Sequence, residues 1–389
     1  MTTRRTTNRT GVDYALLLAV IVLITLGLIM VYSATFPVTK DPLHYLKRQL
    51  VWVVLGAAAL AVAARIDLRF VRRMAPTLMG LAFLALVAVL AIGVAKGNAQ
   101  SWFGDGSVQP SEFAKLAFII YIAAWLASKG DEIRDVTYGL VPFAILLGVV
   151  TGLIMLEPDL GAAVLVLITA GSMFFIAGAE ISQLIIGLLT GVPALLAIIL
   201  TSDYARARVQ VFLHPEADLQ GAGYQVHTIL VALRMGGLFG RGLGAGTQKL
   251  VDPLVHHTDT IFAVIGEELG LVGCLIVIGL FLFIAYRGLR VAFRAQDTFG
   301  TLLALGVTCW FAYQAIVHFA VNTATLPFTG LTLPFVSYGG SSLVSCMAGL
   351  GLLLNVSRTG VERKLRSSAP FAFGWRNGRP RLSSAHRRG

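Results

Sequence analysis

Apolar stretches of about 20 residues recur along this chain, and they constrain its fold more than any other sequence feature. A helix of about 20 apolar residues spans the hydrocarbon core of a bilayer. Hydrophobic residues make up 56% of the 389-residue chain and charged residues only 13%, whereas soluble domains carry about 25% charged residues. This composition excludes a soluble enzyme. It predicts an all-α polytopic membrane protein with ten transmembrane helices, at 14–34, 46–64, 75–95, 113–128, 138–156, 160–178, 181–201, 260–285, 300–321 and 341–357.

The basic residues predict how these helices are oriented. The formal net charge is +11, and 21 of the 31 Lys and Arg residues fall on one side of the membrane when both termini are cytoplasmic. Cytoplasmic flanks of membrane helices are enriched in Lys and Arg, so no nucleic-acid binding is needed to explain the charge. The predicted segments are a basic cytoplasmic N-terminus (1–13), a membrane domain (14–357) and a basic, disordered cytoplasmic tail (358–389). One long extracytoplasmic loop, 202–259, joins the seventh and eighth helices.

An acidic and a basic residue share one face at the outer start of the fourth helix. Glu112 and Lys115 are three residues apart, so their side chains meet on the helix surface. Glu112 also suits the positive end of the helix macrodipole. Lys115 has no such simple explanation, because ionisable groups inside a span are costly and face a partner or a cavity. The pair either is structural or orients Lys115 towards a phosphate.

Further acids lie near the outer ends of other helices. Asp159 begins the sixth helix after a Pro-containing turn, and Asp259 begins the eighth; an acid at a helix N-terminus is favourable in itself. Glu267 and Glu268 lie about two turns inside the eighth helix. At least one of these two glutamates is therefore expected to face the bundle interior.

The sequence predicts no metal site and no disulfide. His256 and His257 are adjacent and point apart on a helix, whereas zinc needs converging ligands. The three cysteines lie inside apolar runs without Cys-x-x-Cys spacing, and they are expected to be buried small hydrophobes. They are Cys274, Cys309 and Cys346.

The long external loop holds basic residues that the membrane topology does not explain. They are Arg206, Arg208, Arg234, Arg241 and Lys249. The glycine-rich segment 236–246 is either a flexible linker or, beside Arg241 and Lys249, a cradle for phosphate. A second irregular segment, 333–342, is tolerated in a membrane only where protein or a water-filled cavity covers it. It is expected to line a polar cavity.

Together these residues predict an outer site for a membrane-borne anionic ligand. A carboxylate among cations suits general-base chemistry beside a phosphate leaving group. The same residue types suit a transporter of a lipid or an anion, so both classes stay open at this point.

Several motifs occur in the order in which one membrane-protein family has them. They are QPSEFAK at 109–115, EPDLG at 157–161, GYQ at 223–225, HTD at 257–259 followed by IFAVIGEELG, and LPFVSYGGSS at 333–342. The chain resembles the SEDS family of RodA, FtsW and SpoVE over residues 11–360. RGLRVA at 287–292 and DTFG at 297–300 make it more similar to the FtsW/SpoVE branch than to RodA.

This resemblance implies a peptidoglycan glycosyltransferase of the bacterial cytoplasmic membrane that polymerises lipid II outside the membrane. It implies that Asp259 is the general base that deprotonates a sugar hydroxyl, with release of undecaprenyl pyrophosphate. Together with the unexplained loop cations, it gives a substrate-binding set of Glu112, Lys115, Asp159, Arg208, Gln225, Arg241, Lys249 and His257. The supporting positions are Trp102, Glu267, Glu268 and Ser341.

The resemblance also implies partners. These are a class B penicillin-binding protein as transpeptidase and other cell-wall synthesis or division proteins. No cofactor is implied, and a divalent cation such as Mg²⁺ or Mn²⁺ beside the pyrophosphate is left open. A lipid II flippase and a non-enzymatic scaffold of the division machinery are the alternative functions.

The chain departs from the family pattern at five places: Leu254-Val255 replaces a Pro-Glu before HTD, Thr228-Ile229 replaces a Gln-Ser after GYQ, and three single residues also differ. Ser101 replaces an Arg before the Trp, Thr260 replaces a common Phe, and His318 stands where an Asn is usual. None of these departures removes Asp259.

Overall fold

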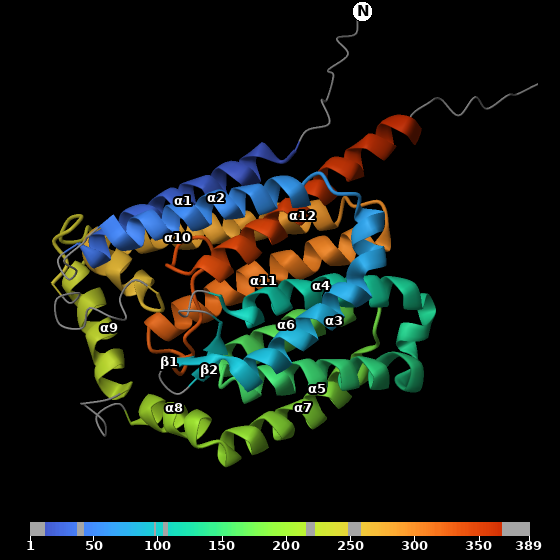
Figure 1. Ribbon diagram of the computed structural model, residues 1–389, viewed down its shortest axis with the longest axis horizontal. Helices are drawn as coiled ribbons and strands as arrows, with labels where there is room; N and C mark the ends of the chain where they lie inside the picture. Colours follow the sequence, from blue (N-terminus) through green and yellow to red (C-terminus); the bar gives the residue numbers. More distant parts are fainter. Residues whose placement is uncertain are drawn as a thin grey trace, which may run out of the picture.

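The computed structural model describes residues 12–36, 43–96, 99–103, 108–214, 222–247 and 258–367, which are mostly helical (Figure 1). Nine helices in these ranges are long and apolar enough to cross a membrane, and a shorter apolar helix adds a tenth. The ten predicted helices are therefore confirmed. They are α1 (Tyr14–Thr35), α2 (Leu43–Ala63), α3 (Leu68–Ile92), α4 (Pro110–Lys129), α5 (Val141–Leu156), α6 (Leu160–Ile176), α7 (Ile181–Thr201), α10 (Ile261–Ala292), α11 (Thr298–Asn322) and α12 (Gly340–Ser367).

Other elements lie between these helices. Two short helices, α8 (Asp203–Leu213) and α9 (Ala222–Gly236), fall inside the segment expected to be a loop. An antiparallel pair of strands, β1 (Val94–Lys96) and β2 (Ala99–Trp102), precedes α4. A 3₁₀ turn, η1 (Gly130–Arg134), and a π turn, η2 (Val136–Leu140), join α4 to α5. The last helix continues to Ser367, ten residues beyond its predicted end and into the segment expected to be disordered.

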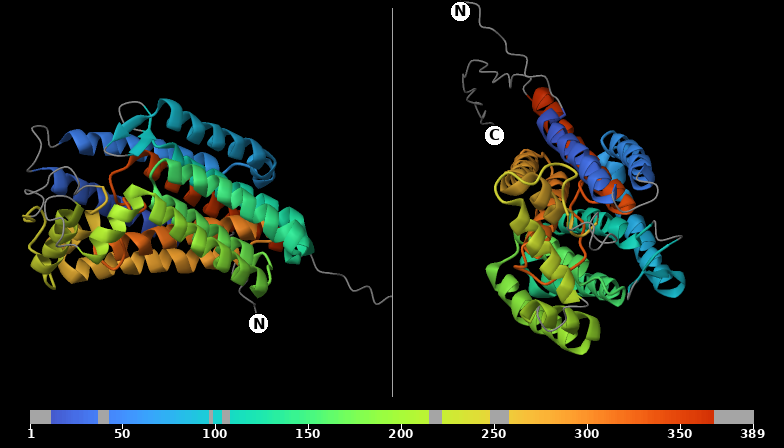
Figure 2. Two further views of the ribbon diagram at one scale, coloured as in Figure 1. Left: turned by 90° about the horizontal axis from the view of Figure 1, so that it is seen from below. Right: turned by 90° about the vertical axis from the view of Figure 1, so that its left-hand side faces the viewer.

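The centre of the bundle is α11, which packs against α4, α6, α10 and α12. Its large side chains, including Trp310 and Phe311, are almost fully buried. Figures 1 and 2 show α11 running through the middle of helices that lie along a common direction. A helix that is apolar all round needs apolar surroundings on every side, and here neighbouring helices supply them.

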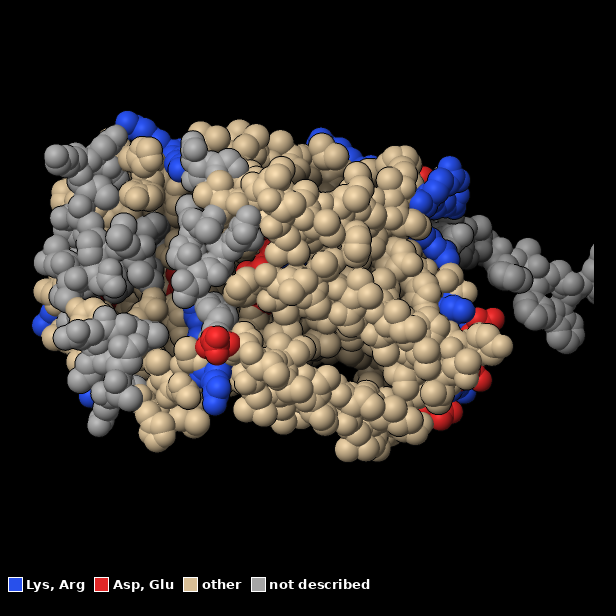
Figure 3. Space-filling model, turned by 60° about the horizontal axis from the view of Figure 1, so that its bottom comes forward, with Lys and Arg blue, Asp and Glu red and all other residues tan. Residues whose placement is uncertain are grey.

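The outer surface is suited to a bilayer. Apolar side chains of α7 face away from the bundle. The main packing partners of this helix are its neighbours in the chain, α6 and α8. Figure 3 shows charged side chains gathered towards the two ends of the molecule, with a broad uncharged region between them. The start of α1 and the end of α12 lie at the same end of the bundle (Figure 1). An even number of spans requires this arrangement.

An ion pair fastens the first helix to the bundle. Asp13 caps α1 by accepting a hydrogen bond from the Leu16 amide at 3.1 Å. The same carboxylate accepts hydrogen bonds from the Arg287 guanidinium near the end of α10, the shortest at 2.6 Å. The N-terminal end of α1 is therefore held at the same level as the turn between α10 and α11.

Candidate functional site

The predicted pair of Glu112 and Lys115 forms a buried ion pair in the first turns of α4. The Lys115 Nζ lies 2.9 Å from Glu112 Oε1, and the side chains are 2% and 6% exposed. The ammonium also lies 5.8 Å from the centroid of the Trp310 ring on α11. Glu112 Oε2 is buried and has no hydrogen-bond partner. The pair is thus enclosed by protein, and one of the two Glu112 carboxylate oxygens accepts no hydrogen bond.

The first two turns of α12 position the start of α4. Ser341 accepts a hydrogen bond from the Gln109 amide at 2.9 Å, just before the first residue of α4. Ser345, one turn later, donates to the Glu112 carbonyl at 2.7 Å. Ser341, in the LPFVSYGGSS motif, and Ser345, just beyond it, therefore fix the position of the α4 turn that carries the Glu112–Lys115 pair.

Asp159 caps α6 and lies in the field of this pair. Its side chain accepts a hydrogen bond from the Ala162 amide at 2.9 Å. Burial raises the pKa of Asp159 above its ordinary value, and nearby Glu112 adds to this rise, whereas Lys115 and Arg208 oppose it. Asp159 therefore belongs to one electrostatic cluster with three other predicted site residues.

Glu157, two residues earlier, is an acid that the sequence analysis did not single out. Both of its carboxylate oxygens are buried without a hydrogen-bond partner. Burial, and to a smaller extent Asp159, raises the pKa of Glu157 to about 8. Glu157 is therefore mostly protonated at neutral pH.

Asp259 lies in the turn immediately before α10 and is partly exposed. Its main-chain carbonyl accepts a hydrogen bond from the Asn322 side chain at 3.0 Å, which ties the turn to the end of α11. Burial raises the pKa of its carboxyl to about 7; Arg208 and Thr258 oppose the rise, and Asp159 adds to it. Asp259 is therefore close to half ionised at neutral pH.

Arg208 on α8 is the cation shared by the two aspartates. Its guanidinium donates to the Phe328 carbonyl at 2.6 Å and lies 5.2 Å from the centroid of the Phe328 ring. Arg208 and Gln225 of α9 line a cavity of about 490 Å³ whose other walls are largely apolar, such as Phe212 and Val321. Two predicted substrate-binding residues thus share one cavity.

The connection between α11 and α12 closes over this cluster; residues 328–331 were not among the predicted site residues, whereas the following segment, 333–342, was expected to line a polar cavity. Leu331 accepts a hydrogen bond at its carbonyl from His318, whose Nδ1 lies 2.8 Å away. Gly330 has a φ of 73°, and a Cβ there would lie 3.7 Å from Oδ2 of Asp259. A Cβ at Gly161 would lie 2.8 Å from Leu331 and 2.9 Å from Thr329. The glycine that ends the EPDLG motif is therefore required for close approach.

The glycine-rich loop after α9 is docked on α10 through two carboxylates. The Thr247 amide donates to Glu267 at 2.6 Å, and the Gly244 amide donates to Glu268 at 3.0 Å. Glu268 also accepts from Ser33 of α1 at 2.7 Å. Both glutamates are 1% exposed, so the prediction that at least one of them faces the bundle interior is confirmed. Within the segment 236–246 the Gly244 amide is bound by the Glu268 carboxylate, and the amides of Arg241 and Gly242 donate to the main-chain carbonyls of residues 267 and 268.

Arg241 belongs to the same docked loop. Its guanidinium donates to the Thr247 hydroxyl at 2.8 Å and lies 3.9 Å from Glu267 Oε1. The loop packs against a kink in α10 at Gly270, whose φ is 69°. The described contacts of Arg241 thus place it with Glu267, whereas Arg208 contacts Phe328 and lowers the pKa of Asp259 through its charge.

Replacing Gly236 with Ala should destabilise this docking. A Cβ at Gly236 would lie 1.8 Å from the Gly266 carbonyl oxygen of α10, so backbone must move. Overpacking of this kind costs about 1–3 kcal/mol, and we expect a lower thermal unfolding midpoint and faster proteolysis of the loop. Gly80→Ala on α3 is the matched control, because a Cβ there meets no atom within 4 Å. Equal stability of the two variants would contradict the docking.

The remaining predicted residues are placed as follows. Trp102 ends β2, where it pairs with Val94 and is partly buried. Lys249 and His257 lie outside the described residues, so their roles stay predictions. In the ranges that the structure describes, no group of three or more His, Cys, Asp or Glu side chains has the arrangement of a metal site.

Comparison with known proteins places the chain in a family. The family model described as "Cell cycle protein", which covers FtsW, RodA and SpoVE, matches residues 14–362. A probable peptidoglycan glycosyltransferase FtsW of Trichlorobacter lovleyi is 40% identical, with 89% of this chain and 93% of that protein covered. Stage V sporulation protein E of Bacillus subtilis is 38% identical, with 91% and 99% covered.

Solved structures show the same fold. One chain of a peptidoglycan synthase complex, from a study of coordinated polymerisation and crosslinking, superposes with a TM-score of 0.77 at 30% identity. The rod shape determining protein RodA of Thermus thermophilus superposes with a TM-score of 0.67 at 30% identity. Each comparison covers 90% of this chain and 98% of the other. The chain belongs to the FtsW/RodA/SpoVE family, in which it is FtsW/SpoVE-like.

Proposed function

We propose that this protein is a peptidoglycan glycosyltransferase that polymerises lipid II and releases undecaprenyl pyrophosphate. The observation that carries the proposal is the electrostatic coupling of a carboxyl group to a cation at one end of the bundle. Asp259 has a pKa of about 7, and Arg208 is the cation that acts on it most strongly. A base whose ionisation is favoured by a nearby positive charge suits the transfer of a sugar away from a pyrophosphate. The names of the relatives support this activity.

In the proposed reaction Asp259 is the general base. Its carboxylate takes the proton of an acceptor sugar hydroxyl, whose oxygen attacks the anomeric carbon of the donor. The bond between that carbon and the pyrophosphate oxygen breaks, and the electron pair leaves with the pyrophosphate. Asp259 then releases its proton to water. A base with a pKa near the working pH is well matched to this task.

The two candidate cations differ in what they can reach. Arg208 is partly exposed and lines the cavity, so we assign it to the leaving pyrophosphate. Lys115 is 2% exposed and already paired with Glu112. We therefore assign Lys115 and Glu112 to setting the charge state of Asp159, on which both act.

The cavity beside Arg208 suits a lipid pyrophosphate. A guanidinium recognises phosphate oxygens in a fixed fork geometry, while the apolar walls formed by Phe212 and Phe328 suit the first prenyl units. A volume of about 490 Å³ admits only the part of an undecaprenyl chain that is nearest to the pyrophosphate. The rest of the chain would lie in the bilayer.

The site is proposed to face the outside of the bacterial cytoplasmic membrane. Lys and Arg residues gather at the other end of the bundle, as the positive-inside rule requires for a cytoplasmic end. The partner is proposed to be a class B penicillin-binding protein, because the structurally similar synthase complex couples polymerisation to crosslinking. A division role fits the similarity to FtsW.

The test is polymerisation of lipid II by the purified protein, alone and with its transpeptidase. The proposal predicts glycan strands together with undecaprenyl pyrophosphate. A flippase would instead move labelled lipid II across liposomes without making polymer. A scaffold would do neither, and either of these outcomes would contradict the proposal.

The pH dependence of polymerisation should report the ionisation of Asp259. Because its pKa is raised to about 7 and the base must be deprotonated, kcat/KM should rise with pH. The expected rise between pH 6 and pH 8 is about tenfold. An Asp of ordinary pKa, about 3.9, would give a flat profile over this range. Removing the cation in Arg208→Gln should move the rise to higher pH, and an unmoved or flat profile would exclude Asp259 as the titrating base.

A further inference from the structure

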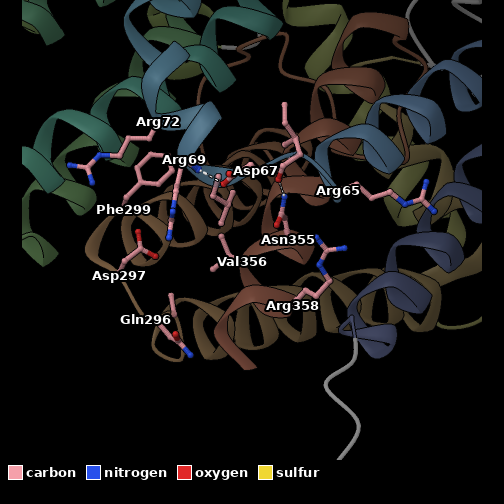
Figure 4. A pocket seen from close by; sticks show the side chains of 13 residues that line it. Arg65, Asp67, Arg69, Arg72, Gln296, Asp297, Phe299, Asn355, Val356 and Arg358 are labelled. Carbon is pink, nitrogen blue, oxygen red and sulfur yellow. Dashed lines mark hydrogen bonds between the residues drawn. The ribbon is translucent and has the colours of Figure 1, made fainter. Parts of the chain in front are cut away.

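A second and larger cavity lies at the opposite end of the bundle, between the starts of α3 and α11 and the later turns of α12. Its volume is about 620 Å³, and four arginines line it together with two aspartates (Figure 4). They are Arg65, Arg69, Arg72 and Arg358, with Asp67 and Asp297. α11 runs from this cavity to the Asp259 site. Its length, at about 1.5 Å per residue, separates the two sites by roughly 36 Å.

The arginines of this cavity have no acidic partner in the part of the chain that the structure describes. No ion pair there includes any of the four. Asp67 instead caps α3 by accepting from the Arg69 amide at 2.8 Å, and Asp297 caps α11 by accepting from the Gly300 amide at 3.4 Å. The acids at the cavity are thus engaged by helix ends, and the net charge of the lining is positive.

One buried guanidinium nitrogen in this cavity donates no hydrogen bond. The Nε of Arg358 is buried and has no hydrogen-bond partner. A buried donor without an acceptor is costly, and the cost is greater for a charged group. An anion in the cavity would remove that cost.

The arrangement of the arginines suits one anion inside and others at the rim. Figure 4 shows Arg69 and Arg358 over the cavity on opposite sides of Asn355 and Val356. Arg65 and Arg72 point outward at opposite edges of the same view. The starts of α3 and α11 also face the cavity, and their macrodipoles favour negative charge.

We propose that this cavity binds a phosphate group through Arg69 and Arg358. The planar fork of an Arg guanidinium matches phosphate oxygens with two parallel hydrogen bonds. The group is either the headgroup phosphate of an anionic phospholipid or the phosphate of a soluble molecule. Basic pockets between transmembrane helices at the cytoplasmic face suit anionic headgroups, and the arginines of this end lie where the cytoplasmic leaflet is proposed to be. The site is separate from the one that carries the proposed reaction.

The experiment compares the full-length protein in nanodiscs of phosphatidylcholine with and without phosphatidylglycerol. Inorganic pyrophosphate is titrated into the phosphatidylcholine sample as the soluble probe. The cavity variant is Arg69→Ala/Arg358→Ala, and the matched control is Arg290→Ala/Arg294→Ala, which removes equal charge from the same end outside the cavity. Thermal unfolding midpoints and bound lipid, counted by native mass spectrometry, are measured for each protein.

The wild type and the control variant should unfold at a higher temperature when one of the two probes is present than when it is absent. Both proteins should also bind that probe. The cavity variant should bind it at least about tenfold more weakly. A response to phosphatidylglycerol alone identifies the lipid headgroup, and a response to pyrophosphate alone identifies a soluble phosphate. Equal responses of the cavity and control variants, or no response of the wild type, would overturn the proposal. If the alanine variant does not fold, Arg69→Lys/Arg358→Lys keeps the charge and should still bind more weakly, because it loses the fork.

Discussion

Asp259→Asn is expected to abolish polymerisation of lipid II while leaving the protein folded. The substitution preserves the shape of the side chain, and the hydrogen bond from Asn322 is to the main-chain carbonyl of residue 259, so it is retained. Only the base is lost. Removal of a general base lowers rates by about 10²–10⁴-fold. The measurement is the rate of glycan strand formation at saturating lipid II, with and without the transpeptidase.

The control for this prediction is Asp131→Asn. Asp131 is exposed in η1, at the far end of α4 from the site, and its variant should polymerise at the wild-type rate. Both variants should have wild-type thermal midpoints. A normal rate for Asp259→Asn would show that another group removes the proton, and Asp159 would be the next residue to test.

Breaking the Glu112–Lys115 pair on one side is expected to have the largest effect on stability. The two side chains are 6% and 2% exposed, so Glu112→Gln or Lys115→Met leaves a buried charge without its partner. Such a loss typically costs about 3–5 kcal/mol. The double variant Glu112→Gln/Lys115→Met carries no buried charge and should recover most of the stability. Thermal unfolding in detergent measures all four proteins.

The double variant also separates a structural role from an electrostatic one. If the pair only holds α4 in place, the recovered protein polymerises lipid II normally. If the pair sets the ionisation of Asp159, as proposed, the recovered protein stays well below the wild-type rate. Single variants as stable as the wild type would show that the pair is not coupled, contrary to its 2.9 Å distance.

Features that depend only on residues close together in the sequence were predictable from it. The ten spans follow from the length of each apolar run, so most of their bounds were predicted within a few residues. The burial of Glu267 and Glu268 followed from their position inside such a run. The same reasoning placed Glu112 beside Lys115, because helix periodicity fixes that pair.

Features that depend on tertiary docking were not predictable. The glycine-rich loop looked suited to phosphate because the acids that occupy its amides, Glu267 and Glu268, lie some 20 residues further along the chain. In the sequence, Arg208 and Arg241 are both arginines of the same external segment. Only the fold shows that one acts on Asp259 and the other lies beside Glu267. Phe328 and Gly330 gave no signal, since their role is to bring main-chain atoms close to side chains.

The shortness of α6 fixes how deep the chemistry takes place. Its 17 residues extend roughly 25 Å, less than the hydrocarbon thickness of about 30 Å. With the opposite end of α6 at the inner edge of the hydrocarbon region, Asp159, which precedes its first residue, lies about 5 Å below the level of the lipid headgroups. A pyrophosphate anchored at the headgroup level would then be drawn downward to react. Turnover should consequently depend on acyl-chain length, with thinner membranes supporting faster synthesis.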